Sequence, residues 1–398
     1  MVNRQIVDKR TKSTEICVCG GGPTGFAAAI AAARSGRQVI ILAPETAIPP
    51  ARTAALLEGS VRFLREHEAW RPDELDGAPL RSMRLIDDTG NLIRAPEVTF
   101  HASEIGLEAF GYNVPNARLV ASLRDLAGNY ENIEIIDEKA SGITMEGGGA
   151  RIETESGMTI ACALIVAADG AKSASRHAAG IEARSWSYPQ SALIGTVNVE
   201  FPHGGTSTEF HTRSGPFTIV PLQQNRMSFV WMQSPESADH AADMPLEEFN
   251  RLMERQAHSI HGRMSVDSER LALPLHGLLS ERFAAHRVML VGEAAHVFPP
   301  IGAQGLNLGL RDVMTFERIV RRYGSDPGSD AALQAYQSGR QGDVRSRTYA
   351  VDLFNRSLLS PFLPVHLLRS SGLSLASAVP AFRHLLMRQG LSSRTAAP

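Results

Sequence analysis

The chain has 398 residues, 43% of them hydrophobic, which is enough for a large core divided between two closely packed domains. Its 40 Lys and Arg residues nearly balance 42 Asp and Glu residues, and the net charge of −2 argues against nucleic acid as the main partner, because no basic excess exists to neutralise phosphates. The three cysteines, Cys17, Cys19 and Cys162, exclude a disulfide framework and a metal-binding spacing, and we expect them in buried strands.

The first residues of the chain bear on its location. Met1–Thr14 is polar and charged and lacks the apolar core of a signal peptide. The sequence therefore predicts a cytoplasmic protein in a reducing compartment.

The amino-terminal region predicts a dinucleotide-binding unit. Glu15–Cys19 has the composition of a short buried strand, an alanine-rich helical segment follows, and Gln38–Leu42 is the next expected strand. Gly20, Gly22 and Gly25 fall in the turn between the first strand and the helix. Glycines there permit a tight turn, close approach of a pyrophosphate and close helix–strand packing.

The end of the second expected strand departs from the dinucleotide pattern. An acid normally stands there and binds the adenosine ribose, whereas this chain has Ala43. Glu45 follows two residues later and is the candidate substitute. Because loss of one charged hydrogen bond costs about 1.5–3 kcal/mol, we expect a weakened dinucleotide site and not an abolished one.

Five further segments have recognisable patterns. Arg52–Trp70 predicts a helix with its leucines on one face, and Arg81–Arg94 predicts a hairpin. Ile133–Ala163 predicts a meander of strands. Ser191–Gln233 alternates apolar and polar residues and is the candidate sheet of a substrate domain, after which Arg287–Val291 returns the chain to the first domain.

An Asp-Gly pair follows a second buried strand. Ala163–Ala168 is apolar, and Asp169 and Gly170 come directly after it. An isolated Asp-Gly pair also forms ordinary turns. Here the preceding strand favours a functional position, because open α/β sheets bind ligands at the carboxyl ends of their parallel strands.

The most informative segment is Gly292–Asp312, which reads GEAAHVFPPIGAQGLNLGLRD. A loop with two prolines runs into an amphipathic helix, so backbone N–H groups and the positive helix end face whatever lies before Gly305. That arrangement suits an anion. His296 in this loop has two interpretations: it contacts a cofactor or relays a proton, or it is fixed by backbone hydrogen bonds.

The carboxy-terminal region from Val351 onward is rich in leucine and phenylalanine, is interrupted by prolines and carries several arginines. No stretch is long and uncharged enough to span a bilayer. Two interpretations stay open: helices packed on the body of the protein, or a peripheral surface for a membrane or a partner protein.

The amino-terminal glycines, the Asp-Gly motif and the late loop, in this order, resemble the FAD-dependent class A aromatic hydroxylases, the relatives of p-hydroxybenzoate hydroxylase. Within this group the chain resembles the ubiquinone-biosynthesis hydroxylases of the UbiH/UbiF/VisC type. That resemblance covers nearly the whole chain and includes Arg52–Leu56, Asn113, Arg118–Leu119, Gly215–Pro221, Ser228–Trp231 and Asn307–Asp312.

The resemblance implies FAD as the cofactor. The three glycines of the fingerprint would hold its pyrophosphate, two arginines would lie along it, Asp169 would lie near both FAD and the nicotinamide, and Glu293 would lie near the ribityl chain. The candidate cofactor-binding residues are Gly20, Gly22, Pro23, Gly25, Glu45, Arg52, Arg118, Asp169, Gly170, Glu293, Pro300, Gly305, Leu306 and Asn307.

Two positions differ from the family pattern. The family usually has aspartate where this chain has Glu293, and the quinone branch often has glycine where this chain has Ala303. Neither difference removes a carboxylate or blocks the helix terminus, so we expect both to be tolerated.

The expected fold is α/β: a Rossmann-like FAD-binding domain with an inserted β-sheet substrate domain and a helical carboxy terminus. The FAD-binding domain would comprise residues 1–77, 111–182 and 276–350. The substrate domain would comprise a hairpin at 78–110 and a sheet at 183–275, and the carboxy-terminal helical region would comprise 351–398.

The implied reaction is hydroxylation of an aromatic ring in a polyprenylated phenol or quinone precursor of ubiquinone. It would use O2 and NAD(P)H and proceed through a flavin hydroperoxide. NAD(P)H would bind transiently, because the chain has no second glycine fingerprint. Two alternatives stay open: a hydroxylase of a small soluble phenol, and a non-catalytic flavin-binding assembly protein. Contact with the inner face of the membrane or with a quinone-biosynthesis complex would accompany the first interpretation.

The substrate would lie between the Ser191–Gln233 sheet and the Pro299–Asn307 loop. The candidate wall residues are apolar and come from both segments, although the sheet residues could equally belong to the core. They are Phe217, Val220, Pro221, Trp231 and Pro299. His296 is the candidate catalytic residue, and no metal ligand is expected.

Overall fold

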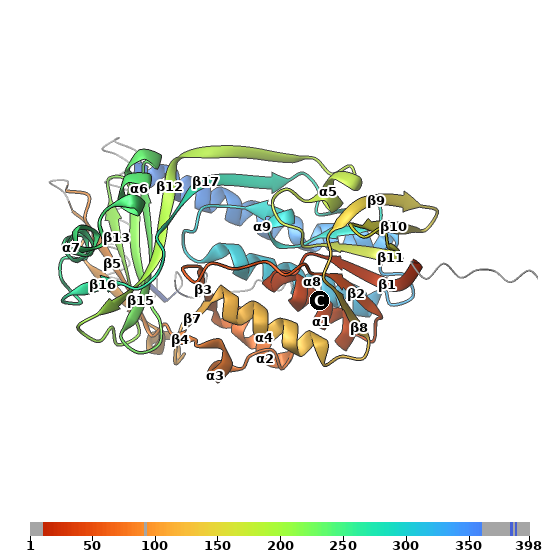
Figure 1. Cartoon of the computed structure of the whole chain (residues 1–398), viewed down its shortest axis with the longest axis horizontal. Helices are drawn as coiled ribbons and strands as arrows, with labels where there is room; N and C mark the ends of the chain where they lie inside the picture. The colour runs from red at the N-terminus through yellow and green to blue at the C-terminus, as the bar shows by residue number, and fades with distance from the viewer. Residues whose placement is uncertain (1–10, 91–93, 360–382, 385–386, 388–398) are drawn as a thin grey trace, which may run out of the picture.

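A computed structural model describes residues 11–90, 94–359, 383–384 and 387. The described chain forms two lobes, and long strands run between them along one side of the molecule (Figure 1). The first lobe is built on a parallel sheet with helices, and the second on a larger, mainly antiparallel sheet.

The sheet of the first lobe has its amino-terminal strand near the centre. The order is β18-β19-β11-β1-β2-β8, and β19, β11, β1, β2 and β8 are parallel. Their bounds, with those of the β9–β10 hairpin that extends β11, are β1 (Thr11–Cys19), β2 (Val39–Leu42), β8 (Ile133–Ile136), β9 (Ala140–Glu146), β10 (Gly149–Thr154), β11 (Thr159–Ala167), β18 (Ala284–Ala285) and β19 (Val288–Leu290).

The first βαβ unit forms as the sequence predicts. Helix α1 (Pro23–Arg34) begins with proline at its first position, where the missing N–H would be unpaired in any case. It ends before Gly36, whose φ of +78° suits glycine after a helix terminus. All three cysteines lie buried in β1 and β11, as expected.

Two long antiparallel strands connect the lobes: β12 starts beside the first lobe, and β17 ends there. Strand β12 pairs with β17 from Ala183 opposite Ser280 to Ile194 opposite Leu271. In the described chain the second sheet has the order β20-β17-β12-β15-β14-β13-β5-β6, with β16 beside β12. The bounds are β5 (Ser82–Asp87), β6 (Val98–His101), β12 (Ala183–Val199), β13 (Thr206–Thr212), β14 (Gly215–Pro221), β15 (Arg226–Gln233), β16 (Met264–Val266), β17 (Leu271–Ser280) and β20 (His296–Val297).

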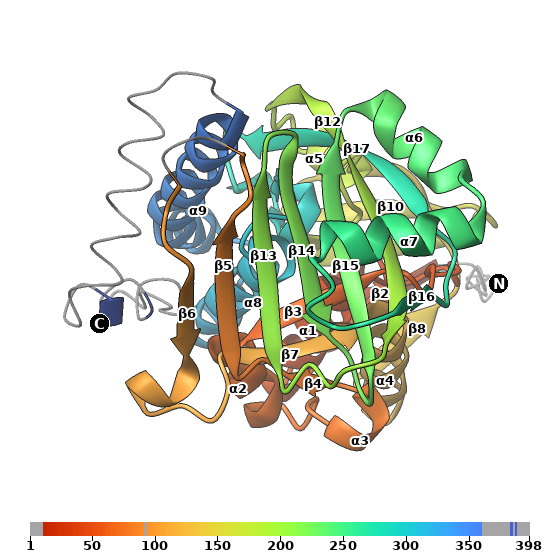
Figure 2. The ribbon, with the colours of Figure 1, turned by 90° about the vertical axis from the view of Figure 1, so that its left-hand side faces the viewer.

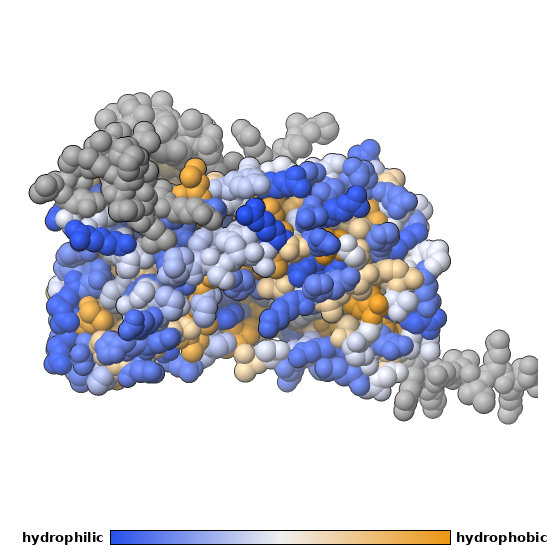
Figure 3. Space-filling view, turned by 90° about the horizontal axis from the view of Figure 1, so that it is seen from above, coloured by the Kyte–Doolittle hydropathy of each residue, from blue (hydrophilic) through white to orange (hydrophobic). Residues whose placement is uncertain are grey.

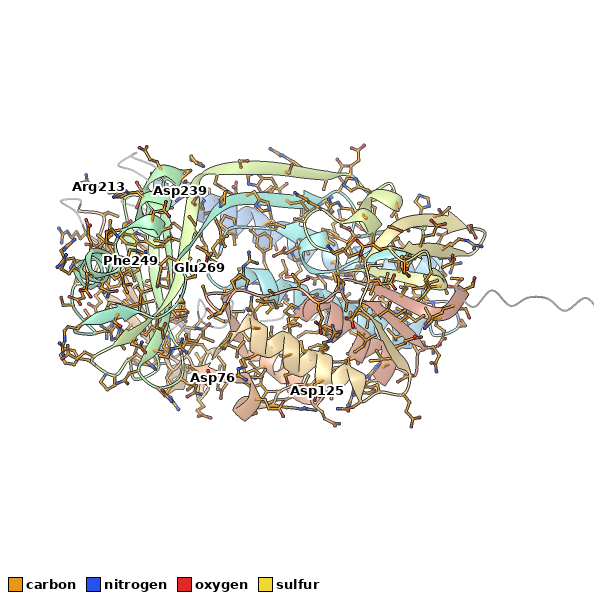
Figure 4. The ribbon with its side chains drawn as sticks, viewed as in Figure 1. Asp76, Asp125, Arg213, Asp239, Phe249 and Glu269 are labelled. Carbon is orange, nitrogen blue, oxygen red and sulfur yellow. The ribbon has the colours of Figure 1, made fainter. Side chains whose placement is uncertain are left out.

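The outer face of the second sheet is covered by two helices, α6 (Pro235–Asp243) and α7 (Leu246–Gln256) (Figure 2). Phe249 of α7 lies in the layer between helix and sheet (Figure 4). Because side chains alternate across a strand, the same strands have an opposite, inner face. Ser228 belongs to that inner face, and its hydroxyl accepts hydrogen bonds from Thr53 and Asn113 of the first lobe, both at 3.0 Å.

The predicted helix at Arg52–Trp70 is wrong in its first part. Thr53–Leu57 is strand β3, and the helix α2 is limited to Glu58–Glu66. The strand forms because it pairs antiparallel with β7 (Gly111–Pro115), which also pairs with β4 (Ala78–Pro79). The hairpin predicted at Arg81–Arg94 is right only in its first strand: β5 pairs with β6, which begins at Val98 beyond the predicted bounds, so the connection is longer than expected.

The remaining helices cover the sheets. They are α3 (Pro72–Leu75), α4 (Asn116–Gly128), α5 (Ala174–Ala178), α8 (Gln304–Arg322) and α9 (Asp330–Leu359), with short 3-10 turns at Ala102–Ile105 and Gly292–Ala294. Among the described helices, none combines the length and the apolar character needed to cross a membrane. On the face seen in Figure 3, apolar residues are interspersed with polar ones. Most of the predicted carboxy-terminal region lies outside the described residues.

We expect Phe217→Ala to lower the free energy of unfolding by about 3–5 kcal/mol, because its ring is fully buried beside Trp231, with 5.1 Å between ring centroids. Phe201→Ala is the control, since this ring is 53% exposed. Guanidinium denaturation followed by tryptophan fluorescence measures both. Equal effects of the two substitutions would contradict the packing described.

Candidate functional site

The carboxyl ends of the parallel strands bring the sequence motifs to one edge of the first sheet. In the register of β11, β1, β2 and β19, Ala167 lies opposite Cys19, Cys19 opposite Leu42, and Ala167 also opposite Leu290. The residues that follow these strand ends include Gly20, Glu45, Asp169 and Glu293. Both Glu45 and Glu293 are exposed there.

The glycines of the first turn fall into two kinds. A Cβ on Gly20 would lie 2.2 Å from the carbonyl oxygen of Ala168, and one on Gly25 would lie 1.9 Å from that of Gly20, so close backbone packing demands both. At Gly22 and Gly305, by contrast, a Cβ would meet no described atom within 4 Å. The space before these two glycines is left open by the protein, as close approach of a ligand requires.

Two helices begin at this edge without a side-chain cap within the described chain. Gly22 is the N-cap of α1 and Ala303 is the N-cap of α8, and neither supplies a capping hydrogen bond. The first N–H groups of both helices and their positive ends are therefore available to a ligand with anionic groups. These residues fit FAD: the prediction that its pyrophosphate would lie before Gly22 and its flavin before Gly305 agrees with the open space at both glycines and stays a prediction.

The amino-terminal turn and the late loop are in direct contact. Thr24 at the start of α1 lies against Gly292 and Gly309: a Cβ on either glycine would lie 3.1 Å or 2.9 Å from the Thr24 hydroxyl oxygen. The tertiary structure thus joins two motifs that are nearly 270 residues apart in the sequence.

Arg52 and Arg118 are brought to the same region by the pairing of β3 with β7. The backbone N–H of Asn116 donates to the carbonyl of Arg52 at 2.9 Å, and Arg118 lies in the first turn of α4, which begins at Asn116. Both side chains are exposed, and neither has an ion-pair partner among the described residues. Their predicted contacts with the cofactor stay predictions.

Asp169 orders the loop that follows β11. Its carboxylate accepts hydrogen bonds from the Ser173 hydroxyl and from the Ser175 backbone N–H. Arg176, in the short helix α5 that these contacts start, donates to the carbonyl of Ala294 at 3.0 Å. The Asp-Gly motif therefore supports the late loop at the residue next to Glu293.

A buried cluster of charged residues from α8 and α9 fixes the late loop by hydrogen bonds. Asp312 of α8 accepts hydrogen bonds from His296 Nε2 at 2.7 Å, from the Gly292 N–H at 2.9 Å and from Arg340 Nε of α9 at 2.7 Å. Burial by itself would raise the pKa of Asp312, but His296, Arg340 and the hydrogen bonds to its carboxylate hold that pKa below its ordinary value. Asp343 extends the cluster by accepting from Arg340.

His296 is buried in this cluster. Its ring is only 2% exposed and stacks on Phe298, with ring centroids 5.4 Å apart. The geometry favours a His296 fixed by hydrogen bonding, but its partner is the carboxylate of Asp312 and not a backbone group as that alternative expected. Its tentative catalytic role stays an untested prediction.

Asn307 and Ala303 shape the start of α8. The Asn307 side chain accepts from the Leu57 N–H and the Ser60 hydroxyl and donates to the carbonyls of Ala55 and Ala303, so it ties α8 to β3 and α2. Ala303 has a φ of +54° and a ψ of 35°, a left-handed conformation that costs a non-glycine residue about 1–2 kcal/mol. This is the position where the sequence differs from the quinone branch.

The candidate substrate residues do not share one face of the second sheet. Phe217 and Trp231 pack on the outer face under α6 and α7, so the core alternative holds for these two residues. Val220 follows Ile219, which belongs to that core, so its side chain points to the opposite, inner face. Pro221 accepts a hydrogen bond from Asn113 at its carbonyl, and Pro299 is buried in the late loop. Pocket roles for Val220, Pro221 and Pro299 stay predictions.

Sequence reasoning missed polar residues on the inner face. Glu209, His211 and Thr218 lie there, beside the partly exposed Val230. The sequence did contain a signal for them. In the strand Thr206–Thr212, neighbouring side chains point to opposite faces, so a core-facing Phe210 places Glu209 and His211 on the other face.

Comparisons with known proteins agree with this site. The family model described as FAD binding domain matches residues 13–347. The ubiquinone hydroxylase UbiL of Rhodospirillum rubrum is 28% identical over 97% of this chain and 91% of the relative. The 3-demethoxyubiquinol 3-hydroxylase of Escherichia coli is 27% identical over 95% of this chain and 98% of the relative.

A solved structure shows the same fold. The p-nitrophenol 4-monooxygenase PnpA from Pseudomonas putida superposes with a TM-score of 0.78 at 18% identity, covering 96% of this chain and all of that chain. The chain belongs to the FAD-binding family, and FAD is its cofactor. The predicted α/β flavin fold and the resemblance to the ubiquinone-biosynthesis hydroxylases are confirmed.

We expect Gly22→Val to abolish FAD binding while the protein stays folded. No described atom lies within 4 Å of the added Cβ and φ is −77°, so the described protein tolerates the side chain, whereas a pyrophosphate in its predicted place would be crowded. Flavin absorbance after reconstitution and the thermal melting of the apoprotein measure the two effects. A variant that binds FAD normally would place the pyrophosphate elsewhere.

We expect Asp312→Asn to lower the free energy of unfolding by about 3–5 kcal/mol, because it removes the more deeply buried of the two carboxylates that pair with the buried Arg340, the other being Asp343. Since the pKa of Asp312 is depressed in the folded protein, its stabilising contribution is present above the unfolded pKa, about 3.9, and is lost as the pH falls through the folded value. Denaturation of the wild type and the variant between pH 3 and pH 7 should show the difference shrinking toward acid pH. Asp239→Asn, at an exposed position of α6 (Figure 4), is the control.

Proposed function

We propose that this chain is an FAD-dependent monooxygenase that hydroxylates the aromatic ring of a polyprenylated phenol or quinone precursor in ubiquinone biosynthesis, with O2 and NAD(P)H as co-substrates. The observation that carries the proposal is the convergence of two uncapped helix N-termini with two open glycines at one sheet edge. The hydroxylases of ubiquinone biosynthesis among its relatives support the substrate class.

The residues of the chain divide the chemical work. FAD, when bound and reduced, supplies activated oxygen for an electron-rich ring. The amino-terminal end of α8 stabilises negative charge that develops on the flavin. The buried cluster around Asp312 and the side chain of Asn307 hold the loop that carries this helix end, so its geometry is set before substrate binds.

The inner face of the second sheet supports an apolar substrate. Val220 and Val230 are partly exposed on this face, as is Leu85 of β5, which lies beside Glu209 in the register. Burial of an isoprenoid tail contributes about 25 cal/mol per Å² of apolar area. The prenylated substrate therefore binds more tightly than its head group alone.

A surface of α9 supports contact with a membrane or with a quinone-biosynthesis complex. Tyr349 and Leu353 are both largely exposed and stand one helical turn apart, so they form one apolar spot. Such contact would let the enzyme collect a substrate that partitions into lipid.

We expect expression of this chain to restore a hydroxylated intermediate in a bacterial strain that lacks its own ubiquinone hydroxylases. Mass spectrometry of quinone extracts measures the product, and the Gly22→Val variant is the control. If no ring-hydroxylation step is restored and the purified protein rapidly oxygenates a simple water-soluble phenol, the hydroxylase of small phenols is the correct assignment. A protein that binds FAD and oxygenates neither would be a flavin-binding assembly protein.

A further inference from the structure

The carboxylate of Glu209, on the inner face of the second sheet, lies where it could bind a substrate. In β13, Phe210 packs in the outer core with Phe217, their ring centroids 5.6 Å apart. Because neighbours along a strand point to opposite faces, Glu209 and His211 both lie on the inner face. Thr218 of β14 lies directly opposite Glu209 in the register.

Two side chains orient this carboxylate. His211 Nε2 lies 2.9 Å from Glu209 Oε1, and the Thr218 hydroxyl donates to Glu209 Oε2 at 3.3 Å. The histidine side chain is 3% exposed, whereas that of Glu209 is 19% exposed. The carboxylate of Glu209 is therefore fixed by side chains of its own sheet, and part of it remains exposed on the inner face.

Apolar residues also lie on this face near Glu209, His211 and Thr218. Leu85 of β5 stands beside Glu209, and Val230 of β15 stands beyond Thr218 in the same row. Among the described residues of β5, β13, β14 and β15, one other carboxylate lies on this face, that of Asp87. It accepts hydrogen bonds from Thr89 and Ala95 in the loop that follows β5. An apolar ligand that carries one hydroxyl group matches such a surface, because the hydroxyl supplies a donor for the carboxylate.

The position of Glu209 relative to the cofactor site fits an aromatic head group. Ser228 accepts a hydrogen bond from Thr53 of β3, and β3 is tied to the start of α8 through Asn307. Glu209 lies on β13 and Ser228 two strands away on β15, displaced by two residues along the strand direction. At ordinary strand spacings their backbones are about 12 Å apart. A ring placed against the late loop can thus direct a hydroxyl group toward Glu209.

We propose that Glu209 is the catalytic residue that accepts the proton of the substrate's ring hydroxyl, and that His211 and Thr218 position its carboxylate. This inference rests on the proposed function. The O–H bond of the phenol breaks, the proton passes to the carboxylate of Glu209, and the electron pair stays on the phenolic oxygen. That pair raises the electron density at the ortho and para ring carbons, which makes the ring a better acceptor of oxygen.

The test is Glu209→Gln in the FAD-loaded enzyme, with 2-geranylphenol as the probe. This nearly isosteric change keeps both hydrogen-bonding partners but removes the proton acceptor. We expect the rate of hydroxylation to fall about a hundredfold or more at pH 7 and to recover at alkaline pH, where the phenol ionises in solution. Glu248→Gln, at an exposed position of α7 on the opposite side of the sheet, is the matched control and should behave as the wild type.

A binding measurement gives a readout that does not depend on turnover. The ultraviolet spectrum of bound 2-geranylphenol should show a phenolate fraction in the wild-type protein that is lost in Glu209→Gln. His211→Asn should lower this fraction and the rate together, whereas a purely structural effect would reduce flavin binding and thermal stability without changing the spectrum of the bound phenol.

The outcomes separate this inference from the proposed function. Full activity and an unchanged phenolate fraction in Glu209→Gln would overturn the role of Glu209 while leaving the hydroxylase assignment intact. If the wild type hydroxylates no prenylated phenol, the proposed function fails, and the spectrum of the bound probe still decides whether Glu209 ionises it.

Discussion

The buried contact between Asp312 and Arg340 is the interaction on which the rest of the site depends. Both side chains are almost fully buried, and a buried charge that loses its partner destabilises a protein by several kcal/mol. Asp312 also holds His296 and the N–H of Gly292, so one carboxylate connects α8, α9 and the loop that carries Glu293. The position of the late loop is thereby coupled to the packing of two helices.

Several groups of the site have no partner among the residues that the structure describes. Two helix N-termini lack side-chain caps, Gly22 and Gly305 face open space, and the exposed Arg52 and Arg118 stand nearby. Ala303 adds a left-handed residue at the start of α8, a conformation that surrounding contacts must stabilise. A long anionic cofactor such as FAD would supply contacts to all of these groups, as the sequence predicts.

The second sheet separates stability from chemistry by its two faces. On the outer face, aromatic and aliphatic residues such as Phe217 and Phe229 pack against α6 and α7. On the inner face, the same strands present small apolar residues, Ser228 in contact with the first lobe, and the Glu209–His211 pair. This division follows from the alternation of side chains along each strand. A single sheet can therefore stabilise its lobe through the outer face and present the inner face to a substrate.

The sequence by itself determined the elements whose signals are local. The glycine turn after β1, the Asp-Gly pair after β11 and the loop before α8 each combine a buried strand or helix with the turn residues that its geometry requires, and the structure has all three where the sequence predicts them. These motifs also carried the resemblance to the flavin hydroxylases, and with it the fold class and FAD.

Only the tertiary structure decided three other features. Residues 53–57 form a strand because β7, more than 50 residues away, supplies its hydrogen bonds. Phe217 and Trp231 belong to the core because α6 and α7 cover their face of the sheet, and alternation does not tell which face a later helix will cover. His296 is committed to Asp312, a partner brought near by the packing of α8. In each case the deciding contact lies outside the segment concerned, so the pattern of that segment does not record it.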